Sequence, residues 1–235
     1  MPKSLKPLML SGLAFFLYSR LTNGAILFYI NQRFVGLTWA AALGLILVAA
    51  SYHIGGKAEA HAHALSWSSF ALVLLPMLLG VLIPPQPLGT TALSNRELNA
   101  VPQAALTLSA GSIRQASEQR EPTLLDWVLT LGEHPDPEAV AGQSVEVIGF
   151  VYRREDLPSG TWMVSRFVVT CCVADATAIG LIVRAPDAAS PSNDQWVHVQ
   201  GHFAAETIQG ERLPVIIAET LTPIEPPAQP YLYYR

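Results

Sequence analysis

The sequence predicts a membrane α-helical N-terminal part and an all-β C-terminal domain, which we expect to be a five-stranded OB-like (oligonucleotide/oligosaccharide-binding-like) Greek-key barrel. A small β-sandwich is the alternative arrangement. Only 14% of the 235 residues are charged, well below the ~25% that is typical of soluble domains. Residues 1–83 carry five basic groups and one acidic group, whereas residues 84–235 carry nine basic and seventeen acidic groups. Beyond Gly142, apolar and polar residues alternate, as they do in half-buried strands.

The membrane region comprises residues 1–83, with helices expected at about 5–21, 35–53 and 66–83. The second and third stretches contain no charged residue, and each has roughly the 17–25 residues that a helix needs to cross the hydrocarbon core. Arg20 interrupts the first stretch. Ending that helix near residue 21 places the guanidinium where its long stem can reach the lipid headgroups.

The basic residues of this region also predict its orientation. Three spans place the two chain ends on opposite sides of the membrane, and Lys3, Lys6 and Lys57 then outnumber Arg20 and Arg33. Because basic residues are retained in the cytoplasm, we expect a multi-pass protein of the cell membrane with an extracytoplasmic C-terminal domain.

A linker and a soluble domain follow the membrane region. Residues 84–120 begin with a proline-rich stretch that ends the third helix, and they show no convincing strand pattern, so we expect a linker. The soluble domain, residues 121–235, starts with a short amphipathic helix capped by Thr123. Five strands are then expected from the alternating pattern, at residues 145–152, 162–170, 179–184, 195–204 and 213–222.

The two cysteines of the chain, Cys171 and Cys172, are adjacent and follow the second expected strand. Three interpretations are open. One cysteine could be a small buried hydrophobic residue with a half-exposed neighbour. Both thiolates and Asp175 could instead converge on a borderline metal ion such as zinc. The third interpretation is a vicinal disulfide or redox-active dithiol.

Histidines supply further candidate ligands. The period of two in the fourth strand places His198 and His202 on one face with Trp196, opposite the valines. That face could simply be solvated, or the two histidines could complete a metal site with the cysteines. His61 and His63, between the second and third helices, form a weaker candidate site.

Several function classes are disfavoured. The chain contains no nucleophile elbow, phosphate-binding glycine loop, zinc-protease helix or dinucleotide fingerprint, so we do not expect an enzyme. Isolated acids such as Asp126, Glu146 and Glu206 are expected to be solvated. The net charge of −8 on residues 84–235 argues against a nucleic-acid partner, because phosphate binding requires clustered Lys and Arg.

The order of these features resembles the YcgQ-like family of bacterial membrane proteins. The residues that carry the resemblance are Tyr29, Ile30, Arg33, the loop 53–63, Pro84, Trp127, Gly142 with the strand 145–152, Arg166, Phe167, the Cys171–Ala176 stretch and Gly180. The resemblance implies a non-enzymatic accessory subunit beside a multi-helix membrane permease, with metal-ion homeostasis as the process it would serve. A stand-alone metal-binding or thiol-redox membrane protein is the alternative.

Overall fold

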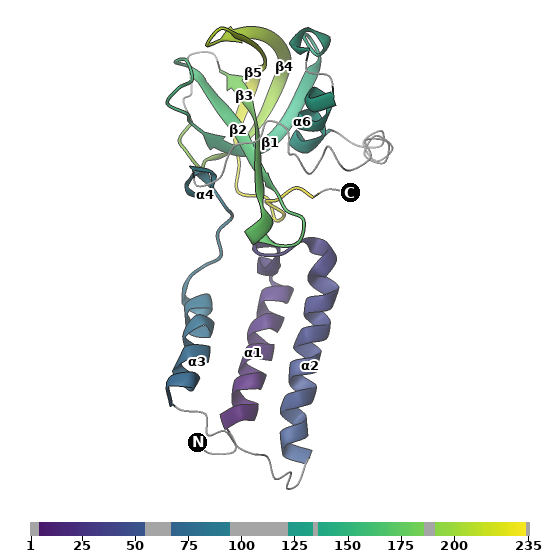
Figure 1. Cartoon of the computed structure of the whole chain (residues 1–235), viewed down its shortest axis with the longest axis vertical. Helices are drawn as coiled ribbons and strands as arrows, with labels where there is room; N and C mark the ends of the chain where they lie inside the picture. The colour runs from purple at the N-terminus through teal and green to yellow at the C-terminus, as the bar shows by residue number, and fades with distance from the viewer. Residues whose placement is uncertain (1–4, 55–66, 95–121, 134–135, 186–190, 234–235) are drawn as a thin grey trace. The chain divides into compact units, whose positions relative to one another are not determined.

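The computed structural model describes residues 5–54, 67–94, 122–133, 136–185 and 191–233 (Figure 1). The chain divides into two compact units, Met1–Gln86 and Pro87–Arg235, and each is described by itself. The boundary lies three residues after the predicted end of the membrane region. The predicted histidine site at residues 61 and 63 and most of the predicted linker, residues 95–121, lie outside the described residues.

The N-terminal unit contains three apolar helices at the predicted positions: α1 (Leu5–Thr22), α2 (Val35–Ile54) and α3 (Trp67–Leu82). Two short 3-10 turns, Ala25–Phe28 and Gln32–Phe34, connect α1 to α2. Figure 1 shows α1 between α2 and α3, and α1 packs against both.

Large apolar side chains lie on the outside of all three helices. Those at least half exposed include Leu8 and Phe15 on α1, Leu37, Leu43 and Leu47 on α2, and Leu72, Leu75 and Leu82 on α3. The stretch Gln32–Tyr52, which contains most of α2, is long and apolar enough to cross a membrane, and no other helix among the described residues meets both criteria.

Arg20 connects α1 to the end of α3. Its Nη2 donates a hydrogen bond to the carbonyl oxygen of Gly80, and its guanidinium carbon lies 5.2 Å from the centre of the Phe16 ring. In an uninterrupted helix, the carbonyl of Gly80 would accept from the backbone of residue 84, but Pro84 has no N–H. Arg20 therefore supplies the donor that the proline removes, and it places a cation at the negative end of the helix dipole.

This arrangement predicts a coupling between Arg20 and Pro84. Replacing Arg20→Leu leaves a carbonyl without a donor, and such a loss costs about 1–3 kcal/mol when the group is shielded from water. The substitution Pro84→Ala restores an N–H that can bond to Gly80, so Arg20→Leu should cost about 1 kcal/mol less in that background. Chemical unfolding of the detergent-solubilised full chain measures both costs.

Arg33→Leu is the matched control, because it removes an arginine from the N-terminus of α2 rather than from the end of α3. Its cost should be the same with Pro84 as with Ala at that position. An equal cost of Arg20→Leu in the two backgrounds would contradict the assignment.

The C-terminal unit is built on five strands, which confirms the predicted all-β domain. They are β1 (Ser144–Tyr152), β2 (Thr161–Val168), β3 (Thr177–Arg184), β4 (Trp196–Ile208) and β5 (Glu211–Pro223). They pair in the order β1-β2-β3-β5-β4, and β4 pairs again with β1, so the sheet closes (Figure 1). All contacts are antiparallel except the parallel pairing of β3 with β5.

The last two strands are longer than predicted because a two-residue turn joins them directly. Gln209 and Gly210 both have positive φ, at 54° and 86°. This is the conformation of the tight hairpin turns whose twist matches that of the paired strands. The ladder therefore runs without a break from the turn to the bulge at Gln200 and Gly201.

Two hydrophobic clusters stabilise the unit. The larger one fills the closed sheet with alternate residues of all five strands and is covered by α6 (Leu124–Glu133).

Thr123 caps α6 as predicted, since Thr123 Oγ1 and the Asp126 amide lie 3.4 Å apart, and the Asp126 carboxylate accepts from the Thr123 amide at 2.7 Å. Asp126 is thus part of a cap, not an isolated solvated acid.

The second cluster lies on Phe150, Phe167 and Trp196 and is covered by two segments outside the strands. One is α4 (Thr90–Ser94), which contributes Leu93. The other is the C-terminal segment 224–233, whose Tyr231 is buried. Residues 88–94, in the predicted linker, therefore pack on the five-stranded sheet and are part of the C-terminal unit.

Candidate functional site

The two cysteines lie in the turn between β2 and β3. β2 ends at Val168, two residues before the predicted end, and a 3-10 turn at Val173–Asp175 precedes β3. The carboxylate of Asp175 accepts hydrogen bonds from the backbone amides of Thr170, at 3.0 Å, and Cys171, at 2.7 Å. This side chain thus holds the loop that carries both cysteines.

The turn brings the two thiols together. Cys171 Sγ and Cys172 Sγ are 3.7 Å apart, although adjacent residues of an extended strand point to opposite faces. Both cysteines are free; Cys171 is exposed and Cys172 is half-buried. Neither serves as a buried core residue, so the packing interpretation of this pair is wrong.

The thiols and the carboxylate influence each other's protonation. A hydrogen bond with the Asp175 carboxylate, reinforced by one with Cys172, raises the pKa of the Cys171 thiol to about 11. Partial burial raises the pKa of Asp175, but hydrogen bonds from the Cys171 thiol and the backbone amides outweigh it, and the pKa is lowered. At neutral pH the Cys171 thiol is therefore protonated and a weak nucleophile.

The two candidate histidines lie on β4 and pair with acids on neighbouring strands. His198 Nε2 is 2.5 Å from Glu146 Oε1 on β1, and His202 Nδ1 is 2.8 Å from Glu219 Oε1 on β5. Within the described ranges, no three His, Cys, Asp or Glu side chains are arranged to hold a metal ion. Cys171, Cys172 and Asp175 thus lie together in the turn without forming a three-ligand group. The two histidines pair with acids on other strands and do not contribute to the turn.

Two further expectations about individual side chains are wrong. Glu146 and Glu206 are not simply solvated: Glu146 pairs with His198, and Glu206 Oε2 is 2.6 Å from Arg184 Nη2. The period of two places Trp196 on the same strand face as the histidines, yet Trp196 is buried against Phe150, with their ring centres 5.9 Å apart. Alternation of polar and apolar residues does not reveal such an additional cluster outside the closed sheet.

Arg166 is an important residue that pattern and spacing did not single out. Its Nε and Nη2 donate to the backbone carbonyls of Pro230, at 3.1 Å, and Gln229, at 2.7 Å. Its guanidinium carbon lies 5.6 Å from the centre of the Trp196 ring, and burial lowers its pKa to about 10. Arg166 thus holds the C-terminal segment on the second cluster.

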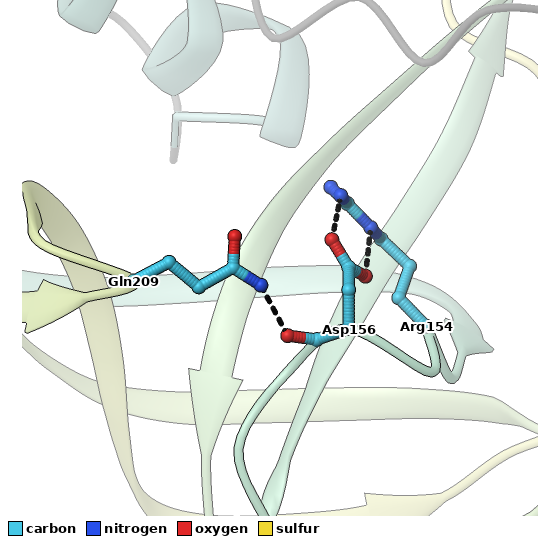
Figure 2. A network of polar contacts seen from close by, with 3 residues as sticks. All are labelled: Arg154, Asp156 and Gln209. Atoms are coloured by element: carbon cyan, nitrogen blue, oxygen red, sulfur yellow. Dashed lines mark hydrogen bonds and ion pairs between the residues drawn. The ribbon is translucent and has the colours of Figure 1, made fainter.

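A polar network also joins the β1–β2 loop to the β4–β5 turn (Figure 2). Arg154 Nε donates to Asp156 Oδ1 at 2.8 Å, Arg154 Nη2 donates to Asp156 Oδ2, and Gln209 donates to the backbone carbonyl of Asp156. The hydrogen bond from Arg154 lowers the pKa of the Asp156 carboxyl. The β1–β2 loop and the β4–β5 turn are therefore linked by a hydrogen bond.

The chain is similar in sequence to known bacterial proteins. The model of the DUF1980 C-terminal domain matches residues 118–234. The UPF0703 protein YcgQ of Bacillus subtilis is 30% identical over 99 residues, which are 41% of this chain and 35% of that protein. A Streptococcus mutans protein is 24% identical over 87% of this chain and 90% of its own length. The chain belongs to the YcgQ-like family.

The two relatives differ in the fraction of their own length that aligns with this chain. The Streptococcus protein is named "Putative two-component membrane permease complex subunit". The YcgQ-like chain aligns with nearly all of that protein but with about a third of the Bacillus one. The family membership inferred from the cysteine-containing stretch and its surroundings is thereby confirmed.

The protonation of the turn leads to a prediction for the YcgQ-like chain. In a Cys172→Ala background, Asp175→Asn removes the carboxylate charge that disfavours the Cys171 thiolate, so the pKa of this thiol should fall. A fall of one in pKa raises the thiolate fraction at pH 8 about tenfold. The pH dependence of iodoacetamide modification, followed by mass spectrometry, measures the change.

The control is Asp156→Asn in the same background, because Asp156 is a carboxylate of another loop. It should leave the profile unchanged. If Asp175→Asn also left the profile unchanged, the Asp175 carboxylate would not control this thiol.

Proposed function

We propose that the protein is a non-enzymatic accessory subunit of a membrane permease complex, with three membrane-spanning helices and an extracytoplasmic OB-like domain. The observation that carries the proposal is the alignment with the Streptococcus protein. It covers 87% of this chain and 90% of that protein, so both units are included. The permease partner would be a separate multi-helix protein of the same membrane.

The surface of the helices supports a membrane anchor. Exposed leucines occur on α1, α2 and α3 alike, and contiguous apolar surface of this kind requires a lipid or protein environment. Tyr18 and Trp39 stack edge to face, with ring centres 5.8 Å apart, at the end of α1 that also carries Arg20. Aromatic residues beside an arginine are typical of the membrane–water interface.

The strand order supports the OB-like assignment. A closed sheet of five strands in the order β1-β2-β3-β5-β4, with β3 and β5 parallel, is the OB arrangement. OB domains bind oligonucleotides on the face of the second and third strands, between the loops that follow the first and fourth strands. Here, Leu93 and Tyr231 pack on that face at Phe167, and the loops are joined through Asp156. These contacts favour a role other than nucleic-acid binding.

A role in metal-ion homeostasis is the finer part of the proposal. The excess of acidic over basic groups in residues 84–235 attracts cations within about a Debye length, ~8 Å, of the surface. The two free thiols at 3.7 Å from each other are donors for a soft or borderline ion. They also favour the second candidate function, a metal-binding or thiol-redox membrane protein that works without a permease.

The test combines two readouts on one variant. Ser94, exposed at the end of α4, is replaced by Cys in a Cys171→Ala, Cys172→Ala background that carries an affinity tag. A maleimide that cannot cross membranes should label this residue in intact cells. Purification in mild detergent should recover one multi-helix membrane protein in a fixed ratio, and tagging that protein should recover this chain in return.

The control is an unrelated three-helix membrane protein with the same tag, which should not recover the partner. Labelling only after lysis would contradict the orientation. Purification of this chain alone, from cells in which it supports metal tolerance, would contradict the permease role and favour the stand-alone protein.

A further inference from the structure

We propose that Cys171 and Cys172 form an open two-thiolate site that binds a tetrahedral divalent ion such as Zn²⁺ and passes it on. This inference deepens the metal-ion part of the proposed function and depends on it only for the direction in which the ion travels. The site itself is argued from the geometry of the turn.

The separation of the two sulfur atoms fits a tetrahedral ion. Zinc–thiolate bonds are about 2.3 Å long, and two sulfurs 3.7 Å apart then make an angle of about 107° at the metal, close to the tetrahedral angle of about 109°. An ion held linearly between two thiolates at the same bond length would need its sulfurs about 4.6 Å apart. The pair therefore fits ions such as zinc better than ions that prefer linear coordination.

The backbone of the turn maintains this separation. Asp175 holds the amides of Thr170 and Cys171, and the 3-10 turn Val173–Asp175 follows directly. Each oxygen of the Asp175 carboxylate accepts a backbone hydrogen bond from this turn, and we assign this residue the role of positioning the thiols. The two sulfurs are then the protein's ligands.

The site is open on its outer side. Cys171 is exposed, Cys172 is half-buried, and no third His, Cys, Asp or Glu of the described ranges completes a metal-binding group with them. Structural zinc sites are closed by four protein ligands, whereas sites that exchange a ligand keep a position free. An ion held by two thiolates retains two positions for water or for donor atoms of a recipient.

The binding step is a ligand exchange without a redox change. Hydrated Zn²⁺, which carries six waters, loses four of them and forms two zinc–sulfur bonds, so that two waters remain on the tetrahedral ion, while the two thiol protons go to solvent. Release to a recipient reverses the step: donor atoms of the recipient first displace the two remaining waters, further donor atoms or water then replace the two sulfurs as both zinc–sulfur bonds break, and the thiolates regain protons from solvent.

The test uses the reduced full chain in detergent and Zn²⁺ alone. Equilibrium dialysis should show one zinc ion per chain, and X-ray absorption at the zinc edge should show two sulfur and two lighter ligand atoms. Loss of residues that merely orient ligands weakens metal binding about 10- to 100-fold, so Cys171→Ser and Cys172→Ser should each weaken it at least as much. A chelating dye should remove the ion without unfolding the protein.

Thr170→Ser is the matched control, since it alters the same turn without removing a thiol, and it should bind zinc like the wild type. Four sulfurs per zinc would mean that two chains close the site, which would overturn the open site. Absence of zinc binding by the reduced wild type, or binding that survives loss of both thiols, would overturn the site itself. None of these outcomes depends on whether a permease subunit co-purifies.

Discussion

Closure of the sheet in the C-terminal unit depends on two glycines, Gly149 and Gly201, because no Cβ atom would fit at either position. A Cβ on Gly149 would lie 2.6 Å from the carbonyl oxygen of Ser165, and one on Gly201 would overlap the carbonyl of Ile217. At Gly149, β1 passes from its long pairing with β4 to a short pairing with β2. Beyond Ser165, β2 therefore no longer pairs with β1, and its free edge forms backbone hydrogen bonds with Leu232 instead. The chain then continues from β2 into the turn that carries the cysteines. The position of that turn follows from how the sheet closes.

A second regularity is that charged side chains bond to backbone groups which local structure leaves unpaired. Arg20 donates to the carbonyl of Gly80, to which Pro84 has no N–H to donate, and Arg166 donates to carbonyls of the C-terminal segment. Asp175 accepts from two amides between β2 and β3, and Asp194 accepts from the Thr90 amide at the start of α4. Each of these bonds gives a partner to a backbone group that no helix or strand hydrogen bond satisfies, so a few charges can determine how irregular segments are held. In a chain with so few charged residues, their positions are correspondingly informative.

The helices and the five strands could be predicted because each has a period that the sequence displays directly. The ends of β4 and β5 were less predictable, since their extension depends on the Gln209–Gly210 turn and on a bulge, neither of which changes the polar pattern. The cluster around Trp196 could not be predicted either. Its partners Leu93 and Tyr231 lie far away along the chain, and local alternation marks such positions as exposed. At the site, residue chemistry identified the cysteines and Asp175, but only the fold shows that the thiols converge and that the histidines pair elsewhere.

The chain thus combines an apolar helical unit with a closed β domain, and the loop between β2 and β3 of that domain presents two thiols that face the same way. An arsenical with one phenyl group and two exchangeable positions, such as phenylarsine oxide, binds stably only when two thiols can reach one arsenic atom. Mass spectrometry of the reduced full chain after treatment should show one arsenical per chain, with both cysteines protected from alkylation. Neither Cys171→Ser nor Cys172→Ser should retain it. Free alkylation of both cysteines in the treated wild type would contradict the convergence of the thiols.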